Sequence, residues 1–183
     1  MLASLTPDLV VTSSAGRARA SSRYLERALG LTATADDRLR EIHLGSWQGL
    51  TRDEAASRYP EEYEAWVRGD DVRRGDGETY AEVGVRAGAA LDDALALVPG
   101  GGLLVAVTHG GTARAVIGSA LGLAPSDWWR FAPLGNARWS VLLETERGYR
   151  LAEHNAGVTE RYSALVEAGD DARPVETVQS PGR

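Results

Sequence analysis

The chain has 183 residues and a formal net charge of −6, with an isoelectric point near 5.1. This acidic balance argues against a nucleic-acid-binding protein, because binding to a phosphate backbone needs a clustered positive surface. The chain has no cysteine, which excludes disulfides, thiolate catalysis and cysteine-ligated metal, and its 43% hydrophobic and 25% charged residues are typical of a folded domain.

No apolar stretch approaches the roughly 20 residues that a membrane helix needs, and the N-terminus lacks the pattern of a signal peptide. We therefore expect a cytoplasmic protein. Its length predicts one domain, which we place at residues 1–167, and the polar stretch 168–183 predicts a loose tail because it has no apolar pattern.

The chain opens with a predicted strand over residues 7–13, which is β-branched and ends in hydroxyl side chains. A helix is predicted over 15–29, with Ser13 or Ser14 as its N-cap and Gly30 as its end. The order strand, turn, helix is how open α/β sheets build anion sites.

Two arginines, Arg17 and Arg19, lie at the start of this helix. A cation there meets the positive end of the helix dipole, which is unfavourable by about 0.3–1 kcal/mol, and a bound anion would reverse that sign. The alternative is that both side chains extend into solvent or pair with nearby carboxylates.

A second predicted strand over 31–35 leads into residues 38–49, which have neither helical nor strand periodicity. We interpret 38–49 as an ordered functional loop because it is rich in charged side chains and glycine and also contains a histidine. Glu41 is its candidate acid. The alternative for Glu41 is a surface carboxylate paired with Arg38 or Arg40.

Two capping boxes, Thr51–Glu54 and Thr79–Glu82, predict the starts of further helices. The first opens a short helix that ends before Pro60, where another helix begins, and the second opens a long helix with an apolar stripe that reaches Val98. The polar, glycine-rich stretch 70–77 between them is a predicted loop or lid.

The most informative stretch is the apolar strand 103–107, which delivers His109 to its C-terminal end and is followed by a helix to about Leu121. Gly110 and Gly111 open that helix, so its free N–H groups can be approached closely by phosphate or carboxylate. The alternative is a satisfied histidine at a tight turn.

A short helix over 126–129 and two strands over 137–145 and 148–155, which form a hairpin, complete the predicted elements. In a parallel sheet the C-terminal strand ends open onto one crevice, which would bring Arg17, Glu41 and His109 together. Arginine and helix N–H groups suit phosphate oxygens, and a carboxylic acid can protonate a leaving alkoxide.

The sequence does not supply an obvious nucleophile. Metal-assisted hydrolysis is disfavoured because the two Asp-Asp pairs are not joined to any histidine at ligand spacing. A Ser-His-Asp triad is disfavoured because no Gly-x-Ser-x-Gly elbow occurs. His43 and His154 are interpreted as structural or peripheral.

Several motifs, taken in order, resemble those of the histidine phosphatase superfamily, with the phosphoglycerate-mutase-like fold. The resemblance covers roughly residues 5–158, and within the family the run 38–50 looks most similar to actinobacterial phosphatases. The motifs that carry it are Thr12-Ser13, Arg17-Ala-Arg-Ala-Ser21, Leu39-Arg-Glu-Ile-His-Leu-Gly-Ser-Trp-Gln-Gly49, Gly77-Glu-Thr79, Val107-Thr-His-Gly-Gly111 and Gly135-Asn-Ala137.

The resemblance implies a three-layer α/β/α fold with a mostly parallel sheet, and a histidine that is transiently phosphorylated without metal or other cofactor. Arg17 would match the phosphate-binding arginine, Glu41 the proton donor and His109 the second histidine that contacts the phosphoryl group beside Gly110. The expected partner is a small-molecule phosphomonoester, with a homodimer left open, and neither nucleic acid nor membrane.

The family's first motif, a strand that ends in Arg-His-Gly and carries the nucleophile, does not occur in this sequence. We therefore expect no nucleophile in this chain, an N-terminally truncated fold without the first strand, catalytic loop and first helix, and poor stability alone. One hypothesis is that a longer natural chain is the enzyme. The alternatives are a non-catalytic pseudophosphatase or phospholigand-binding module, and a phosphoglycerate mutase.

Overall fold

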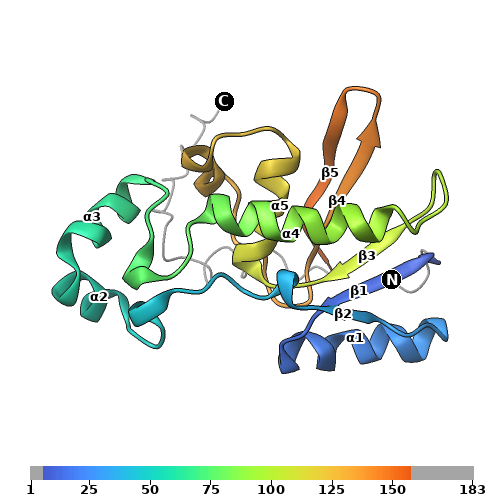
Figure 1. The fold of residues 1–183 in the computed structure, drawn as a ribbon, viewed down its shortest axis with the longest axis horizontal. Helices are drawn as coiled ribbons and strands as arrows, with labels where there is room; N and C mark the ends of the chain where they lie inside the picture. The colour runs from blue at the N-terminus through green and yellow to red at the C-terminus, as the bar shows by residue number, and fades with distance from the viewer. Residues whose placement is uncertain (1–5, 158–183) are drawn as a thin grey trace, which may run out of the picture.

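The computed structural model describes residues 6–157, which form an α/β fold (Figure 1). Short 3₁₀ turns occur at Asp37–Leu39, Gly45–Trp47, Arg74–Asp76 and Pro125–Arg130. The strands and helices are, in chain order, β1 (Leu9–Ser13), α1 (Gly16–Leu29), β2 (Thr34–Asp36), α2 (Arg52–Arg58), α3 (Pro60–Arg68), α4 (Tyr80–Leu95), β3 (Leu104–Val107), α5 (Gly110–Ala120), β4 (Trp139–Thr145) and β5 (Gly148–Ala156).

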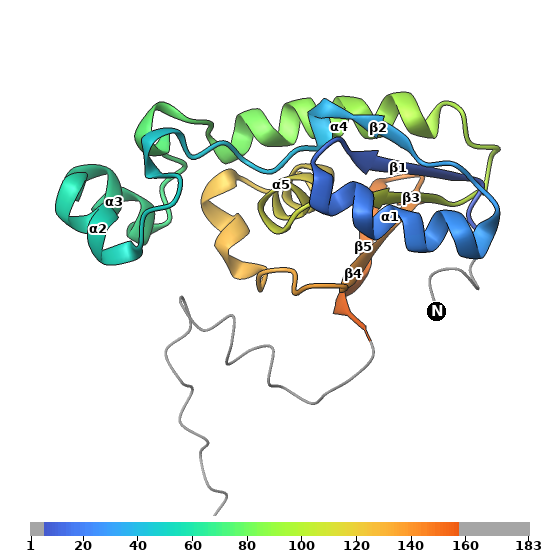
Figure 2. The ribbon, with the colours of Figure 1, turned by 90° about the horizontal axis from the view of Figure 1, so that it is seen from below.

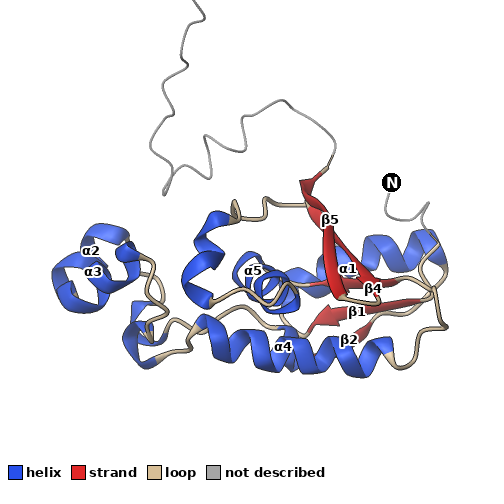
Figure 3. Ribbon diagram, turned by 90° about the horizontal axis from the view of Figure 1, so that it is seen from above, coloured by secondary structure: helices blue, strands red, loops and turns tan. Residues whose placement is uncertain are grey.

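The central sheet has the strand order β2-β1-β3, and all three strands are parallel. Helix α1 lies on one side of this sheet and α4 on the other (Figure 3), so the predicted mostly parallel, layered α/β architecture is confirmed. Parallel pairing brings the C-terminal ends of β1 and β3 to the same edge, where the turns to α1 and α5 begin.

Within the described range 6–157, β3 has a strand neighbour on one side only, and β4 pairs with β5 alone. The central strand β1 is buried at Val10 and Val11, whereas every residue of β3 is half-buried. The side of β3 that faces away from β1 is therefore an open strand edge in the described part of the chain.

The core between the sheet and α4 is built from small side chains on the helix. Ala87, Ala90 and Ala94 are buried against Val11 and Leu39, as the predicted apolar stripe requires. Alanine at these positions lets the helix axis lie close to the strands, which fixes the height of α4 above the sheet edge.

The predicted N-caps of α2 and α4 are confirmed, whereas that of α1 is not. The capping boxes of α2 and α4 both form as predicted, through Thr51 with Glu54 and Thr79 with Glu82. The predicted serine N-cap of α1 is wrong, because Ala15 occupies that position without a side-chain cap bond.

The second strand begins at Thr34, three residues later than predicted. It forms only where it can pair with the last three residues of β1, Val11 to Ser13, and the apolar residues before it stay outside the sheet. The long helix α4 also ends earlier than its apolar stripe, at Leu95 instead of Val98.

Helices α2 and α3 form a small lobe at one end of the molecule, away from the sheet (Figure 2). The buried Trp47 ring anchors this lobe, with its centroid 6.0–6.2 Å from the rings of Tyr59, Tyr63 and Trp66. The C-terminal end of the loop 38–49 is therefore held in place by aromatic packing against this lobe.

The backbones of the loop 38–49 and the stretch 70–77 pack closely against each other at Gly45 and Gly75. Gly45 has φ +51°, and a Cβ there would lie 1.6 Å from the carbonyl oxygen of Gly75. Any side chain at this position would force the two segments apart, so the predicted loop or lid is tied to the loop 38–49 by direct backbone contact.

The predicted hairpin is confirmed as the antiparallel pair β4–β5, which contacts α5 through β5. The predicted tail over 168–183 lies outside the described residues, and the single-domain boundary at 167 stays a prediction. In the range 6–157 no helix is long and apolar enough to cross a membrane.

Candidate active site

The turns after β1 and β3 bring Arg17 and His109 into direct contact. The Arg17 Nε–H donates to His109 Nδ1 at 3.1 Å, and the other ring nitrogen, Nε2, lies 2.8 Å from the hydroxyl oxygen of Ser13. Because Nδ1 accepts a hydrogen bond, the ring proton of neutral His109 lies on Nε2 and points at Ser13. Both ring nitrogens are therefore engaged within the protein.

The environment of His109 favours this neutral form. Burial lowers the pKa of His109, the Glu41 carboxylate opposes that change, and the positive charges of Arg17, Arg40 and Arg86 add to the lowering. The side chain is only 7% exposed, so water cannot solvate an imidazolium there.

Glu41 lies against the first turn of α5. Its Oε1 accepts from the N–H groups of Ile42 and Thr112, both at 3.0 Å, and its Oε2 accepts from the Gly111 N–H at 3.2 Å. The N-terminal N–H groups of the helix thus hold a carboxylate, as the helix dipole favours. No ion pair joins Glu41 to Arg38 or Arg40 within residues 6–157, so the alternative of a paired surface carboxylate does not describe this geometry.

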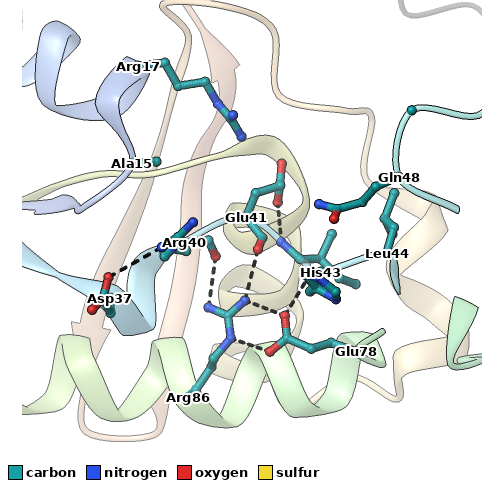
Figure 4. Close-up of a pocket in the computed structure, with 12 residues that line it drawn as sticks. Ala15, Arg17, Asp37, Arg40, Glu41, His43, Leu44, Gln48, Glu78 and Arg86 are labelled. Carbon is teal, nitrogen blue, oxygen red and sulfur yellow. Dashed lines mark hydrogen bonds and ion pairs between the residues drawn. The ribbon is translucent and has the colours of Figure 1, made fainter. Parts of the chain in front are cut away.

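Arg86 of α4 braces the backbone that carries Glu41 (Figure 4). Its guanidinium donates to the carbonyl oxygens of Arg38, Arg40 and Glu41 at 2.5, 2.9 and 3.3 Å, and to both oxygens of Glu78 at 2.7 and 2.8 Å. All five N–H donors of the arginine are used.

Glu78 completes this brace. It accepts from the backbone N–H of His43 at 2.9 Å, and hydrogen bonding from Arg86 lowers the pKa of its carboxyl. The loop that positions Glu41 is therefore fixed by an arginine and a carboxylate that neutralise each other.

An open cavity of about 540 Å³ is bordered by Arg86, Glu78 and the loop that they hold. Figure 4 shows Arg17 reaching from α1 toward Glu41 on one side, with Gln48 on the other side. His109 contacts Arg17 and does not line the cavity itself. The lining residues come from the α1 start, the loop 37–49 and the α4 region: Ala15, Arg17, Asp37, Arg40, Glu41, Ile42, His43, Leu44, Gln48, Gly49, Glu78 and Arg86.

The structure brings Arg17, Glu41, His109 and Gly110 to one edge of the sheet, as predicted. Gly110 is the first residue of α5, and a Cβ there would meet only the carbonyl oxygen of Leu134, at 3.6 Å. Arg19, the other arginine of the first turn, is exposed and does not line the cavity.

Three residues of the site were not singled out from the sequence. Ser13 was predicted as a helix cap and as part of the Thr12-Ser13 motif, without a role in the site, although its hydroxyl lies 2.8 Å from His109 Nε2 and accepts from the Ala15 N–H at 3.2 Å. Glu78 stood inside a recognised motif without a role, and Arg86 lay in a helix with no signal of its own. Only the fold brings Arg86 to the backbone near Glu41.

The remaining histidines occupy different places. His43 was interpreted as structural or peripheral, yet it lines the cavity, with Nδ1 accepting from the Gly45 N–H at 3.1 Å. His154 lies in β5, 2.9 Å from both the Ser140 hydroxyl and the Ala132 carbonyl oxygen. In the part of the chain that the structure describes, no three His, Asp or Glu side chains are arranged to hold a metal ion.

Comparison with known proteins gives a consistent result. Residues 1–157 match the family model described as "Histidine phosphatase superfamily (branch 1)". The chain is 32% identical over 143 residues to a glucosyl-3-phosphoglycerate phosphatase of Mycobacterium tuberculosis, covering 74% of this chain and 64% of the relative. The chain therefore spans less than two thirds of the length of these curated relatives.

A solved structure gives the same family. The mycobacterial glucosyl-3-phosphoglycerate phosphatase in complex with inorganic phosphate superposes with a TM-score of 0.77 at 32% identity, over 85% of this chain and 80% of that one. A probable phosphoglycerate mutase of Yersinia enterocolitica is 36% identical over 121 residues, covering 63% of this chain and 54% of the mutase. The predicted resemblance to actinobacterial phosphatases is confirmed.

Proposed function

The chain belongs to the histidine phosphatase superfamily, and on this premise we propose that its residues serve a metal-independent phosphomonoester phosphatase that acts through a phosphohistidine. The observation that carries the proposal is the convergence of Arg17, His109 and Glu41 at the start of α5. A cation, a helix N-terminus and a carboxyl group at one cavity are the groups that phosphoryl transfer needs.

Arg17 is the proposed phosphoryl ligand. Its Nε–H donates to His109, and its two terminal NH₂ groups have no hydrogen-bond partner within the described residues. Such a fork can bind two phosphate oxygens in a charge-assisted, bidentate manner. The Gly110 N–H at the first position of α5 would donate to a third oxygen.

Glu41 is the proposed proton donor. In the first step the bond between phosphorus and the ester oxygen breaks, the phosphoryl group passes to a histidine nitrogen, and Glu41 gives its proton to the departing alkoxide. In the second step water attacks the phosphohistidine, Glu41 takes a proton from that water, and inorganic phosphate and the free histidine result. The carboxyl group thus returns to its starting state.

The nucleophile is proposed to lie outside residues 6–157. His109 has both nitrogens engaged, His154 is bonded to Ser140 and Ala132, and His43 accepts from Gly45. The open edge of β3 supports this proposal, because an added strand paired there would end beside His109. We expect the 183-residue chain alone not to turn over phosphomonoesters.

The experiment compares the 183-residue chain with a form that carries an additional N-terminal strand ending in Arg-His-Gly. Only the longer form should hydrolyse p-nitrophenyl phosphate and accumulate acid-labile phosphohistidine, detected by ³¹P NMR. Turnover of an alkyl phosphate by the shorter chain that survives His109→Ala and Glu41→Gln would contradict the site assignment. Absence of turnover in both forms, with phosphate still bound, would favour the pseudophosphatase alternative.

The role of Glu41 has its own test in the longer form. Glu41→Gln keeps the shape of the side chain but cannot donate a proton, so kcat on alkyl phosphates, which are poor leaving groups, should fall by about 10²–10⁴. Hydrolysis of p-nitrophenyl phosphate should fall much less, because its leaving group needs no proton. Equal losses for both substrates would argue against general acid catalysis.

The physiological substrate is proposed only as a small phosphomonoester, with glucosyl-3-phosphoglycerate as the first compound to assay because the relatives carry that name. A mutase remains an alternative through the Yersinia relative. Conversion of one phosphoglycerate isomer into another, without release of inorganic phosphate, would favour it.

A further inference from the structure

Arg74 is a buried arginine that does not line the active-site cavity. It lies in the stretch 70–77, between the lobe and α4, and is only 6% exposed. Its Nη2 is buried without a hydrogen-bond partner, and its guanidinium forms no ion pair within residues 6–157. An arginine side chain stays charged in proteins, so the described part of the chain leaves a buried cation without a paired counter-charge.

Two aromatic rings lie against this guanidinium. Its central carbon is 5.7 Å from the ring centroid of Trp66 in α3 and 5.1 Å from that of Tyr80 at the start of α4. Cation–π attraction offsets part of the cost of removing the charge from water. A ring face does not replace the hydrogen-bond acceptors that the in-plane N–H groups need, so the edge of the guanidinium still requires an acceptor.

The carboxylates that hold the surrounding backbone are not paired with Arg74. Glu62 accepts from the Gly75 N–H at 2.7 Å. Asp71 accepts from the backbone N–H of Tyr80 at 2.6 Å and from the next N–H of α4 at 2.9 Å. Both acidic groups are therefore engaged with backbone donors, and the counter-charge for the guanidinium has to come from elsewhere.

A second buried donor lies in the same aromatic cluster. Arg74 Nη2 and Trp47 Nε1 are the two buried side-chain polar atoms of residues 6–157 that lack a partner. The Trp47 ring centroid is 6.1 Å from that of Trp66, and a Cβ on Gly75 would lie 2.7 Å from the backbone nitrogen of Trp47. The two donors thus belong to chain segments that are in contact, and both need an acceptor.

We propose that Arg74 and Trp47 form a buried binding site for a small inorganic monoanion of the size of chloride, which joins the lobe to the loop 38–49. An anion suits the site better than water, because the guanidinium needs a counter-charge as well as an acceptor. One negative charge balances one guanidinium, whereas a phosphate dianion would leave an excess charge in the same buried surroundings.

The anion acts on the active site through the backbone. Trp47 belongs to the loop 38–49, which carries Glu41. Glu78, four residues after Arg74, accepts from the backbone of the same loop at 2.9 Å. An anion that holds the two segments together therefore stabilises the loop that presents the proposed proton donor.

The test measures urea denaturation of the 183-residue chain in chloride, with gluconate as a larger anion at the same ionic strength. An anion that binds only the folded chain raises the folding equilibrium constant by the factor 1 + [anion]/Kd. For a Kd of about 20 mM, we expect a gain of about tenfold at about 0.2 M chloride. Anomalous diffraction from crystals grown in bromide should place a bromide ion beside Arg74.

Two variants remove the two donors separately. Arg74→Met keeps much of the side-chain length without the charge, so the chloride dependence should disappear. Its stability in gluconate should stay the same or rise, because an apolar side chain suits a buried position better than an unpaired cation. Trp47→Phe removes the indole N–H but keeps a ring, and should weaken chloride binding about threefold to tenfold.

The matched control is Arg73→Met. Arg73 is the adjacent arginine, but it donates to the Gly77 carbonyl oxygen at 2.6 Å and pairs with Glu82, so its removal should leave the gain in chloride unchanged. Arg17→Gln should also leave that gain unchanged, which separates the lobe junction from the cavity.

The contrary outcomes are distinct. Equal stability of the unchanged chain in chloride and gluconate would overturn the inference. Loss of the chloride gain in Arg17→Gln but not in Arg74→Met would assign the anion to the cavity and overturn it as well. If Arg74→Met does not fold, Trp47→Phe and the bromide position decide, and an unchanged chloride gain with bromide bound elsewhere would contradict the proposed site.

Discussion

The cavity is lined by two kinds of arginine. Arg86 holds the loop backbone near Glu41 together with Glu78, and every donor of its guanidinium is used inside the protein. Arg17 and Arg40 present guanidinium groups that the protein itself uses only in part. The same residue type thus serves opposite purposes within one site.

The difference separates scaffold from ligand binding. A fully engaged arginine cannot give a ligand a hydrogen bond without losing one to the protein, so its removal should lower the free energy of unfolding. Removal of an open arginine should change the stability of the unliganded protein little and should weaken ligand binding.

Replacing Arg86 by alanine should lower the free energy of unfolding by roughly 3 kcal/mol, because it breaks five hydrogen bonds and leaves Glu78 as an unpaired, largely buried carboxylate. The Arg86 and Glu78 side chains are 22% and 25% exposed, so water can compensate only in part. Urea denaturation followed by circular dichroism measures the change. A loss below about 0.5 kcal/mol, the range of the surface control Arg23→Ala, would show that the brace does not carry the loop.

Replacing Arg17 by alanine should have the opposite profile. We expect the Kd of inorganic phosphate to rise about 10–100-fold, because charge-assisted hydrogen bonds are lost, with the free energy of unfolding unchanged within about 0.5 kcal/mol. Loss of a cation from the first turn of α1 offsets the lost contact with His109. Calorimetry and urea denaturation on the same variant measure both quantities. A stability loss as large as that of Arg86→Ala would remove the distinction between the two kinds of arginine.

The smallest effect concerns His109, the buried histidine that Arg17 contacts. Burial lowers the pKa of His109 below its ordinary value of 6.5, so in acid the unfolded chain takes up a proton that the folded site resists. The contribution of neutral His109 to stability is therefore complete above about pH 6.5 and is lost as the pH falls below 6.5 toward the folded pKa, with a slope of at most about 1.4 kcal/mol per pH unit.

Urea denaturation of the chain and of His109→Gln between pH 7.5 and 5.5 measures this slope. The variant should show the flatter dependence over that window. The depressed pKa of Glu78 has its effect only below its ordinary value of 4.5, outside the window. Parallel curves for both proteins would contradict the predicted protonation of His109.

The local elements could largely be read from the sequence because their signals are local. Both capping boxes, the Gly30 helix end, the strand before His109 and the hairpin all form as their residues predict. The predictions were wrong where contacts with other segments set the structure. β2 starts only where β1 can pair with it. In the turn before α1, Ser13 forms hydrogen bonds with His109 and the Ala15 N–H instead of capping the helix.

The sequence by itself determined the family, the layered α/β order of the elements and the candidates Arg17, Glu41 and His109, since these depend on residue types at fixed spacing along the chain. Only the tertiary structure decided which arginine is scaffold and which is open. Arg38, Arg40 and Arg86 are alike in sequence, and their roles differ because folding brings carboxylates and carbonyl oxygens from distant segments to Arg38 and Arg86, and only a shared, distant carboxylate to the side chain of Arg40.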